Sequence, residues 1–310
     1  MTPRLPLVPA SFPLASLASL ALASFGCASA PPPASQLPNA DAAVARMHAT
    51  TDSCVAVQAK AKIDHFGKQG PVKRIRADLL MMVAVPARLR MDIVSPFGVN
   101  VATLTSDGSR FALADLRDKR FYSGPAKACN IARLTSVPVP GPVLVDLLRG
   151  EAPVLVHGAR AGLADTSRIA WSSKGYYVVT FEGKNSTTEE IHMTPRPEDL
   201  GKPWSEQRMR VLEVIVRQQG LVLYRAELEG HTSTAMAKPR VDPEGIDAPI
   251  PPSGAVCTAE LPRRVHVEVP GLEEDVLFRY DEVTWNPPLP RDIFQQPQPP
   301  GLQPFPVDCD

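Results

Sequence analysis

The sequence has little that would support catalysis, metal binding or nucleic-acid binding. Its six histidines are scattered, and it contains no H-E-x-x-H, G-x-S-x-G or phosphate-binding glycine motif. Its cysteines form no C-x-x-C pair and have no zinc-site spacing. Lys plus Arg equals Asp plus Glu at 33 each, so no charge bias favours nucleic acid or acidic ligands. We therefore expect a protein that is not an enzyme, with no catalytic residues, no metal, no cofactor and no nucleic-acid partner.

Long apolar runs are also scarce, and the run at the N-terminus is too short to span a bilayer. It covers residues 14–25, follows the single charge of Arg4 and ends in small residues. This pattern is typical of an export signal, which we place over residues 1–26.

The end of this signal allows two interpretations. In the first, Ser24 to Cys27 is a lipobox, and Cys27 becomes the acylated first residue of a lipoprotein. Gly26 fits that pattern, although Ser24 stands where leucine is common. In the second, cleavage follows the small residues that end at Ala30, which removes Cys27 and releases a soluble protein.

Proline is abundant and is concentrated where regular structure is not expected. Residues 27–39 are interpreted as a Pro-rich tether, 231–254 as a Pro-rich insertion loop and 295–310 as a Pro-rich tail. The remaining range, 40–294, is long enough for one large β-rich domain.

Apart from Cys27, the chain has an even number of cysteines, which suits an oxidising compartment. We expect two disulfides, and sequence alone leaves all three pairings open. The residues concerned are Cys54, Cys129, Cys257 and Cys309.

Alternating apolar residues over 88–124 predict an antiparallel meander of four strands. Turn residues separate the strands at 96–98, 107–108 and 117–120. Strands are also expected at 54–66 and 74–85. The run 79–85 is apolar on both faces, so something should cover the outer side of the sheet there.

Three short helices are expected, over 39–50, 130–134 and 142–148. The last two carry a broad apolar surface that could pack on the sheet as a lid. The alternative is that this surface simply completes a closed core.

Further strands are expected after residue 168, and one hairpin among them turns at 218–220, with Leu212, Val214 and Val216 on one side. The expected strands are 168–173, 176–182, 188–193, 210–217, 221–229, 263–269 and 276–284. The fold class is thus mainly β, with about eleven strands and short helices in one domain.

An apolar cavity in such a sheet would suffice to hold a lipid. Each buried methylene contributes about 0.8 kcal/mol, so a chain of roughly fifteen would be held by on the order of 12 kcal/mol before opposing terms. The candidate cavity-lining residues are Leu79, Met81, Leu89, Met91, Ile93, Ile131, Leu134, Leu144 and Leu148. The alternative for each of them is an ordinary place in the core.

Four stretches resemble the LolA/LolB group of outer-membrane lipoprotein-localisation proteins, and within it LolB. They are RMDIVSPFGVNVATL, IARLTSVPVPGPVLVDLLRG, WSSKGYYVVTFEG and LPRRVHVEV. The resemblance implies an unclosed, curved antiparallel β-barrel whose lid helices cover a hydrophobic cavity for the acyl chains of lipoproteins. It also implies that Phe97, in the Pro-aliphatic-Gly turn position, helps to insert cargo into the membrane.

The resemblance further implies a location and partners. A LolB-like protein is anchored at the periplasmic face of the outer membrane, and it receives acylated lipoproteins from a periplasmic LolA-like carrier. We expect it to be a monomer that also contacts outer-membrane lipid. The chain departs from the family pattern at Phe97, in the insertion 231–254 and in its four extra cysteines. Two alternatives stay open: a soluble LolA-like chaperone in the periplasm, and a lipid-sensing or envelope interaction module that transfers nothing.

Overall fold

The computed structural model describes residues 30–67, 74–95 and 97–309 of the 310-residue chain. The expected signal sequence, Cys27, Pro96 and the turn after Gly67 therefore lie outside the described residues.

One large sheet contains almost all of the strands. Its hydrogen-bonded order is β17-β6-β5-β4-β3-β2-β1-β16-β15-β11-β10-β9-β8-β7, with β13 beside β16, and β12 and β14 form a separate pair. The strands are β1 Ala56–Gly67, β2 Arg74–Ala84, β3 Arg88–Val94, β4 Asn100–Ser106, β5 Arg110–Asp115, β6 Arg120–Pro125, β7 Arg168–Ser172, β8 Tyr176–Glu182, β9 Thr187–Pro195, β10 Met209–Gln218, β11 Leu221–Glu229, β12 Thr232–Ser233, β13 Ala235–Met236, β14 Glu260–Leu261, β15 Arg264–Val269, β16 Glu274–Trp285 and β17 Gln303–Pro306.

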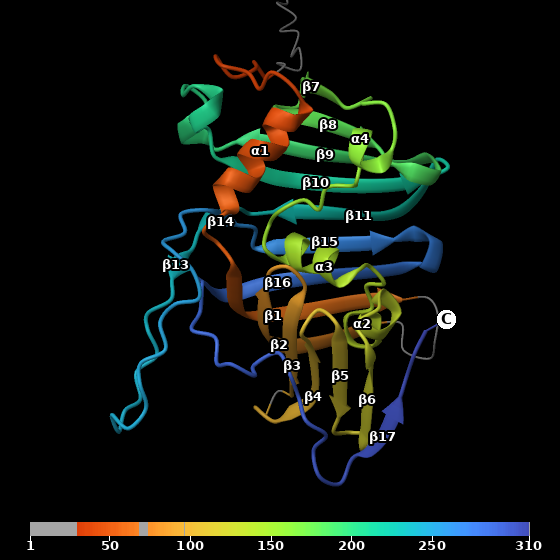
Figure 1. Cartoon of the computed structure of the whole chain (residues 1–310), viewed down its shortest axis with the longest axis vertical. Helices are drawn as coiled ribbons and strands as arrows, with labels where there is room; N and C mark the ends of the chain where they lie inside the picture. The colour runs from red at the N-terminus through yellow and green to blue at the C-terminus, as the bar shows by residue number, and fades with distance from the viewer. Residues whose placement is uncertain (1–29, 68–73, 96, 310) are drawn as a thin grey trace, which may run out of the picture.

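The sheet consists of two antiparallel meanders, β1 to β6 and β7 to β16, joined where β1 pairs with β16. It bends so strongly that β3 to β6 run across the direction of β8 to β11 (Figure 1). In the described sheet β17 and β7 are the outer strands, and they do not pair with each other. The expected mainly β, curved and unclosed architecture is confirmed.

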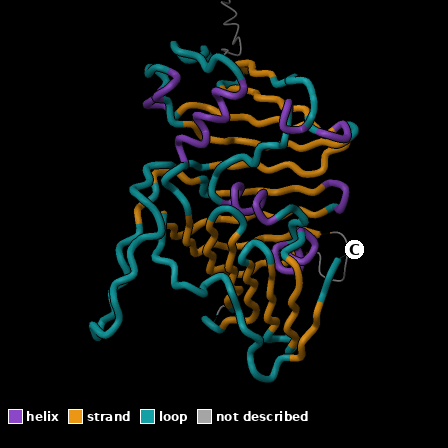
Figure 2. Tube along the Cα trace, viewed as in Figure 1, coloured by secondary structure: helices purple, strands orange, loops and turns teal. Residues whose placement is uncertain are grey.

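The helices lie on the concave face of this sheet, as Figures 1 and 2 show. They are α1 Ala40–Thr51, α2 Ala128–Thr135, α3 Gly141–Leu148 and α4 Gly158–Ala161, with 3-10 turns at Lys184–Ser186, Pro197–Asp199, Trp204–Glu206 and Pro270–Leu272. α1 contacts β8 and β10, α2 contacts β5, and α3 contacts β2 and β3. Each helix therefore covers a different part of the sheet.

The predicted four-strand meander is confirmed, with its turns where the sequence placed them. The connections fall between Val94 and Asn100, Ser106 and Arg110, and Asp115 and Arg120. Period-two alternation predicts these strands well because their larger apolar side chains, such as Leu89, Met91 and Leu104, recur at every second residue on the buried concave face.

The hairpin of β10 and β11 differs from its expected pattern. A β-bulge shifts the register between Val211 and Glu213, so Val211 is buried whereas Leu212 is only half-buried. Val214 and Val216 are buried as expected. A bulge inserts one extra residue and reverses the facing of those beyond it, which a simple alternation rule cannot anticipate.

The Pro-rich C-terminal segment packs against the convex face of the first meander. Phe294, with Leu289 and Ile293 beside it, covers the outward alanines of β1 and β2, and Leu302 packs on β5 and β6. This is the expected outer cover of the apolar run 79–85, although Leu80 stays 44% exposed.

β17 lies inside the range expected to be a tail, where it adds a parallel strand to β6. Gln303 donates its backbone N–H to Lys119, just before β6, and Val307 donates to Ser123 of β6, while Pro304 and Pro306 have no N–H to donate. Proline is compatible with an edge strand when its missing donor would face away from the sheet.

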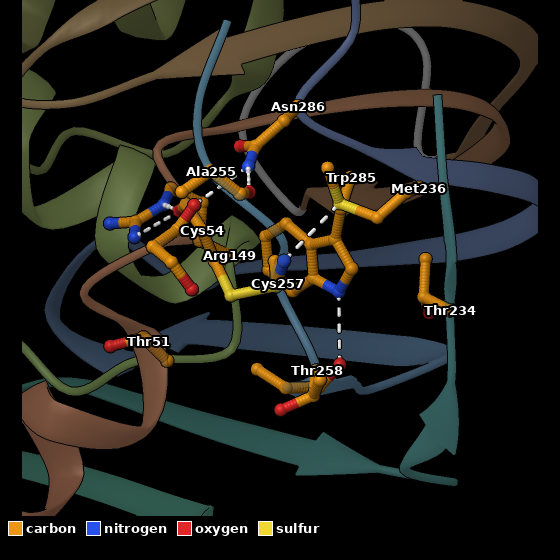
Figure 3. Close-up of a disulfide and its surroundings, with 12 residues drawn as sticks. Thr51, Cys54, Arg149, Thr234, Met236, Ala255, Cys257, Thr258, Trp285 and Asn286 are labelled. Atoms are coloured by element: carbon orange, nitrogen blue, oxygen red, sulfur yellow. Dashed lines mark hydrogen bonds between the residues drawn. A yellow bond between two sulfur atoms is a disulfide. The ribbon is translucent and has the colours of Figure 1, made fainter. Parts of the chain in front are cut away.

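The two expected disulfides are present. Cys54 pairs with Cys257, and Cys129 pairs with Cys309. The first joins the start of β1 to the end of the insertion region, and Figure 3 shows it packed beside Trp285 and Arg149. The second joins α2 to the end of the C-terminal segment.

We predict that the double substitution Cys129→Ser/Cys309→Ser lowers the free energy of unfolding by about 2–4 kcal/mol, because it frees the chain end beyond β17. Denaturant unfolding at pH 7 measures this change. The variant should also bind more of a hydrophobic dye, since the cover of the convex face loosens. An unfolding midpoint and dye binding equal to those of the wild type would contradict the role given to this disulfide.

Candidate functional site

The candidate cavity-lining residues come together on the concave face. Leu79 and Met81 of β2 and Leu89 and Met91 of β3 are buried, as are Ile131, Leu144 and Leu148 of the helices that cover them. All seven belong to one apolar cluster, and Ile93 and Leu134 are partly buried at its margin. α3 packs over β2 and β3 and α2 packs over β5, so the lid is closed.

Local sequence explains where the lid helices begin and end. Pro142 lies in the first turn of α3, where its missing N–H leaves no hydrogen bond broken. Gly150 ends the segment with φ +79°, and a Cβ there would lie 2.6 Å from Pro262. Ser136 ends α2 in the left-handed region. The lid is therefore made of separate short helices, each ended by its own local sequence.

Sequence reasoning missed two other parts of the concave surface. α1 is a second cover, because its Ala43 and Met47 are buried against the second meander. That meander contributes Tyr177 and Phe181 of β8 to the same cluster. Their alternation with polar neighbours was visible in the sequence, but nothing in it indicated that both meanders share one apolar face.

The segment 151–157, which we call the strap, crosses the concave face between α3 and α4 (Figure 1). α1 holds it by ion pairs: Glu151 Oε1 lies 2.5 Å from His48 Nδ1, and His157 Nε2 lies 3.8 Å from Asp41. The hydrogen bond with Glu151 raises the pKa of His48. These polar contacts are the joint between α1 and the strap.

A second polar cluster lies at the end of α3. Arg149, only 4% exposed, donates two hydrogen bonds to the carbonyl oxygen of Cys54, at 2.5 and 3.0 Å, and one to Glu151 at 3.3 Å. Figure 3 shows Arg149 reaching the disulfide-linked Cys54. Burial, and then the nearby charge of Glu151, raise the pKa of Asp146 to about 7.

Glu189 is a carboxylic acid inside the apolar concave surface. It lies on β9 opposite Phe181 of β8 and Val216 of β10, and it is 1% exposed. Its Oε2 accepts the N–H of Leu155 in the strap at 2.8 Å. Burial raises the pKa of Glu189 to about 8. The acid is therefore protonated near neutral pH.

The turn between β3 and β4 presents apolar side chains to solvent. Phe97 is 92% exposed and Val99 is 61% exposed, and Leu116 in the neighbouring β5–β6 turn is 41% exposed. The backbone N–H of Leu116 donates to Val101 at 3.0 Å, which ties the two turns together. We call Phe97, Val99 and Leu116 the tip. Phe97 is thus free to contact another surface, as expected for its position.

A groove of about 650 Å³ lies beside the tip. Basic side chains outnumber acidic ones in its lining, with Lys62, Arg76, Arg117 and Arg279 against Asp78. Asp64, which is buried next to the groove, binds Arg76 at 2.9 Å and Arg279 at 3.4 Å. Lys62 pairs with Asp281 at 3.2 Å and Arg117 with Asp118 at 3.4 Å, so the groove offers ion-paired basic groups next to exposed apolar side chains.

One group of described residues has the composition of a metal site. Ligand atoms of His266, Glu268 and Asp275 lie within 4.8 Å of one another on β15 and β16. His266 Nε2 already lies 2.6 Å from Asp275, and its Nδ1 lies 3.6 Å from Glu227. These contacts show that the three residues form a surface ion-pair network.

Comparisons with known proteins give likenesses in structure. No family model and no curated protein matches the sequence. A DUF1329 family protein from Desulfovibrio piger superposes with a TM-score of 0.46 at 10% identity, covering 81% of this chain and 94% of that one. A putative outer membrane lipoprotein-sorting protein domain from Vibrio parahaemolyticus gives 0.45 at 8% identity, covering 83% and 96%. A LolA superfamily protein from Nitrosomonas europaea gives 0.42 at 11% identity, covering 83% and 98%.

These similarities concern only the overall course of the chain and assign no function. We therefore infer the function from the geometry of this chain. Within the described part of the chain, no helix is long and apolar enough to cross a membrane.

We predict that Glu189→Gln stabilises the protein increasingly between pH 5 and pH 8. The folded-state pKa lies above that of an exposed glutamate, so the unfolded state loses its proton first and wild-type stability falls as pH rises through this window. Glutamine is neutral throughout and avoids this loss. The difference should reach about 1 kcal/mol or more at pH 8, measured by denaturant unfolding at each pH. A difference that stays constant with pH would contradict the buried, protonated state of Glu189.

Proposed function

We propose that this protein is a cell-envelope protein that binds the acyl chains of lipoproteins beneath α1, α2 and α3 and passes them to the outer membrane. The observation that carries the proposal is the apolar concave surface, which is continuous across both meanders and covered by separate short helices. A second sheet would close such a surface through a continuous set of hydrogen bonds, whereas separate short helices can move apart one by one. Acyl chains would then replace the contacts that the helices make in the closed state.

Binding of this kind needs no catalytic group, because burial of methylenes supplies the free energy. The methionines of the concave surface suit chains of differing length, since the thioether side chain adapts to irregular shapes. Met81 and Met91 lie beneath the lid, and Met193 lies on the second meander. We therefore propose a binding and transfer role in place of an enzymatic one.

The tip and the basic groove support membrane contact. Exposed aromatic and aliphatic side chains enter the interfacial region of a bilayer, and neighbouring Lys and Arg side chains are attracted to anionic lipid. Phe97 and Val99 would enter the bilayer while Arg117, 86% exposed beside them, meets lipid phosphates. We propose that this end of the molecule contacts the membrane during release.

The anchored, LolB-like form of this proposal depends on acylation of Cys27. One observation supports retention of Ala30, as the anchored form requires. Ala30 donates its N–H to Ser173 at 2.9 Å and accepts the indole N–H of Trp171 at 3.0 Å, beside the outer strand β7. Residues 30–39 thus begin against the sheet at the end of the molecule opposite the β3–β4 turn (Figure 1). Cleavage after Ala30 would remove this residue and its contacts, whereas acylation of Cys27 would retain them; the soluble, LolA-like form stays the alternative.

We predict that Leu134→Glu weakens binding of a fluorescent fatty-acyl probe at least tenfold. Leu134 lies at the margin of the cluster on α2, so a charge there meets the bound chain without entering the fully buried core. Fluorescence titration measures the affinity, and circular dichroism checks the fold. Leu221→Glu, at a 74% exposed position in β11, is the matched control and should bind the probe normally. Equal affinity for all three proteins would place the acyl site elsewhere.

We predict that Phe97→Glu reduces binding of the unacylated protein to vesicles containing anionic phospholipid about tenfold or more, because an inserted phenylalanine contributes about 1.5–3 kcal/mol. Vesicle co-sedimentation measures the partitioning. Ile246→Glu, at a 79% exposed position in the insertion loop, is the control for loss of an exposed apolar side chain. If Phe97→Glu and Ile246→Glu bind vesicles as the wild type does, the tip is not a membrane contact.

A further inference from the structure

Glu189 is a polar residue within an apolar surface. Its Oε1 is buried and has no hydrogen-bond partner among the described residues, although Oε2 accepts the N–H of Leu155. A buried polar atom without a partner lowers stability by about 1–3 kcal/mol, and an apolar residue of similar size would avoid that loss. The retained polar atom therefore indicates a partner that the closed state lacks.

The hydrogen-bonding pattern identifies what kind of partner would fit. Oε2 receives a donor, so in the neutral acid the proton resides on Oε1, which becomes a free O–H donor. A free donor in apolar surroundings requires an acceptor from the ligand. Tyr224 stands on the same concave face two strands away, since Glu189 and Tyr224 both pair with Val216. Its phenol adds a second polar group beside the first.

Among the described residues, the strap contacts the carboxyl of Glu189 directly. Leu155 contacts the carboxyl through its N–H, and the adjacent Val156 is 62% exposed. The strap contains no helix or strand over 151–157, and the ring of His157 packs on Phe181 at 4.2 Å beside Glu189. Displacement of this single layer would open the carboxyl to a ligand without unfolding the sheet.

We propose that Glu189 is a recognition residue for the carbonyl oxygen of an acyl ester, which its Oε1 hydroxyl binds once the strap has moved. This inference rests on the acyl-binding function proposed above and assigns the two ends of the ligand. The hydrocarbon would lie on the apolar cluster beneath α2 and α3, and the ester would lie on the second meander. An acyl ester joins a long apolar chain to a strong acceptor, which matches a lone donor within an apolar face.

The test compares two lipids of equal chain length, a dipalmitoyl glycerol ester and the corresponding dihexadecyl glycerol ether. The ether lacks the carbonyl and is a weaker acceptor. Displacement of a fluorescent acyl probe from the full mature protein gives both affinities. We expect the wild type to bind the ester about tenfold more tightly than the ether.

Two substitutions at Glu189 and one control sharpen the comparison. Glu189→Leu should bind both lipids with the affinity of the wild type for the ether, because the donor is gone while the apolar site remains. Glu189→Gln keeps a donor and should retain most of the preference. Glu190→Leu changes the neighbouring residue on the opposite face, where Glu190 pairs with His192, and should leave the ratio unchanged.

The outcomes separate the two proposals. Equal binding of ester and ether by the wild type would overturn the role of Glu189 and leave the acyl-binding function standing, and no variant is needed to see this result. A preference that survives in Glu189→Leu would also overturn it. Binding of neither lipid by the wild type would contradict the acyl-binding function itself, and the role of Glu189 with it.

Discussion

The pairing of β1 with β16 is the constraint on which the rest of the structure depends. These long strands come from the beginning and the end of the folded chain, and their register runs from Val57 opposite Trp285 to Gly67 opposite Glu274. The pairing joins two meanders that would otherwise be separate sheets. A sheet of this width must twist and curl, and here it does so without closing. One concave apolar face results, and within the described part of the chain it is covered by α1, which precedes the sheet, and by the short helices that connect the two meanders.

Because the concave face is apolar, a polar group on it points to a function other than packing. Where a sheet buries one face, each inward position normally carries an apolar side chain. Glu189 breaks this pattern, whereas Glu190 follows it with an outward ion pair. The buried acid and the polar joint between α1 and the strap both lie where the cover is thinnest. Recognition and opening are thus concentrated on the second meander, while the lid over the first meander is mainly apolar.

Much of the fold could be predicted from the sequence because strand alternation and turn residues are local signals. The meander 88–124 and the inward facing of Leu79 and Met91 follow from strand alternation, while the turn residues indicate the exposure of Phe97 and the apolar face of the helix 142–148 indicates the burial of Leu144. Non-local features could not be predicted in this way. The disulfide partners are 203 and 180 residues apart, so spacing does not distinguish the pairings. The sequence does not show which of the adjacent residues Glu189 and Glu190 faces inward. The prolines of β17 argue against a strand in that segment, so it could not be predicted.

The disulfide between Cys129 and Cys309 makes the cover of the concave face asymmetric. α2 is bonded covalently to the chain end, which in turn pairs with β6, so this side of the cover can only act as a hinge. The strap is held without a covalent bond, by ion pairs to α1, by hydrogen bonds with Arg149 and Glu189, and by packing of Ala152 and Val154 on the apolar cluster. A ligand that enters from the second meander would therefore pass its hydrocarbon chain in first, toward the hinge, and its ester last, beside Glu189.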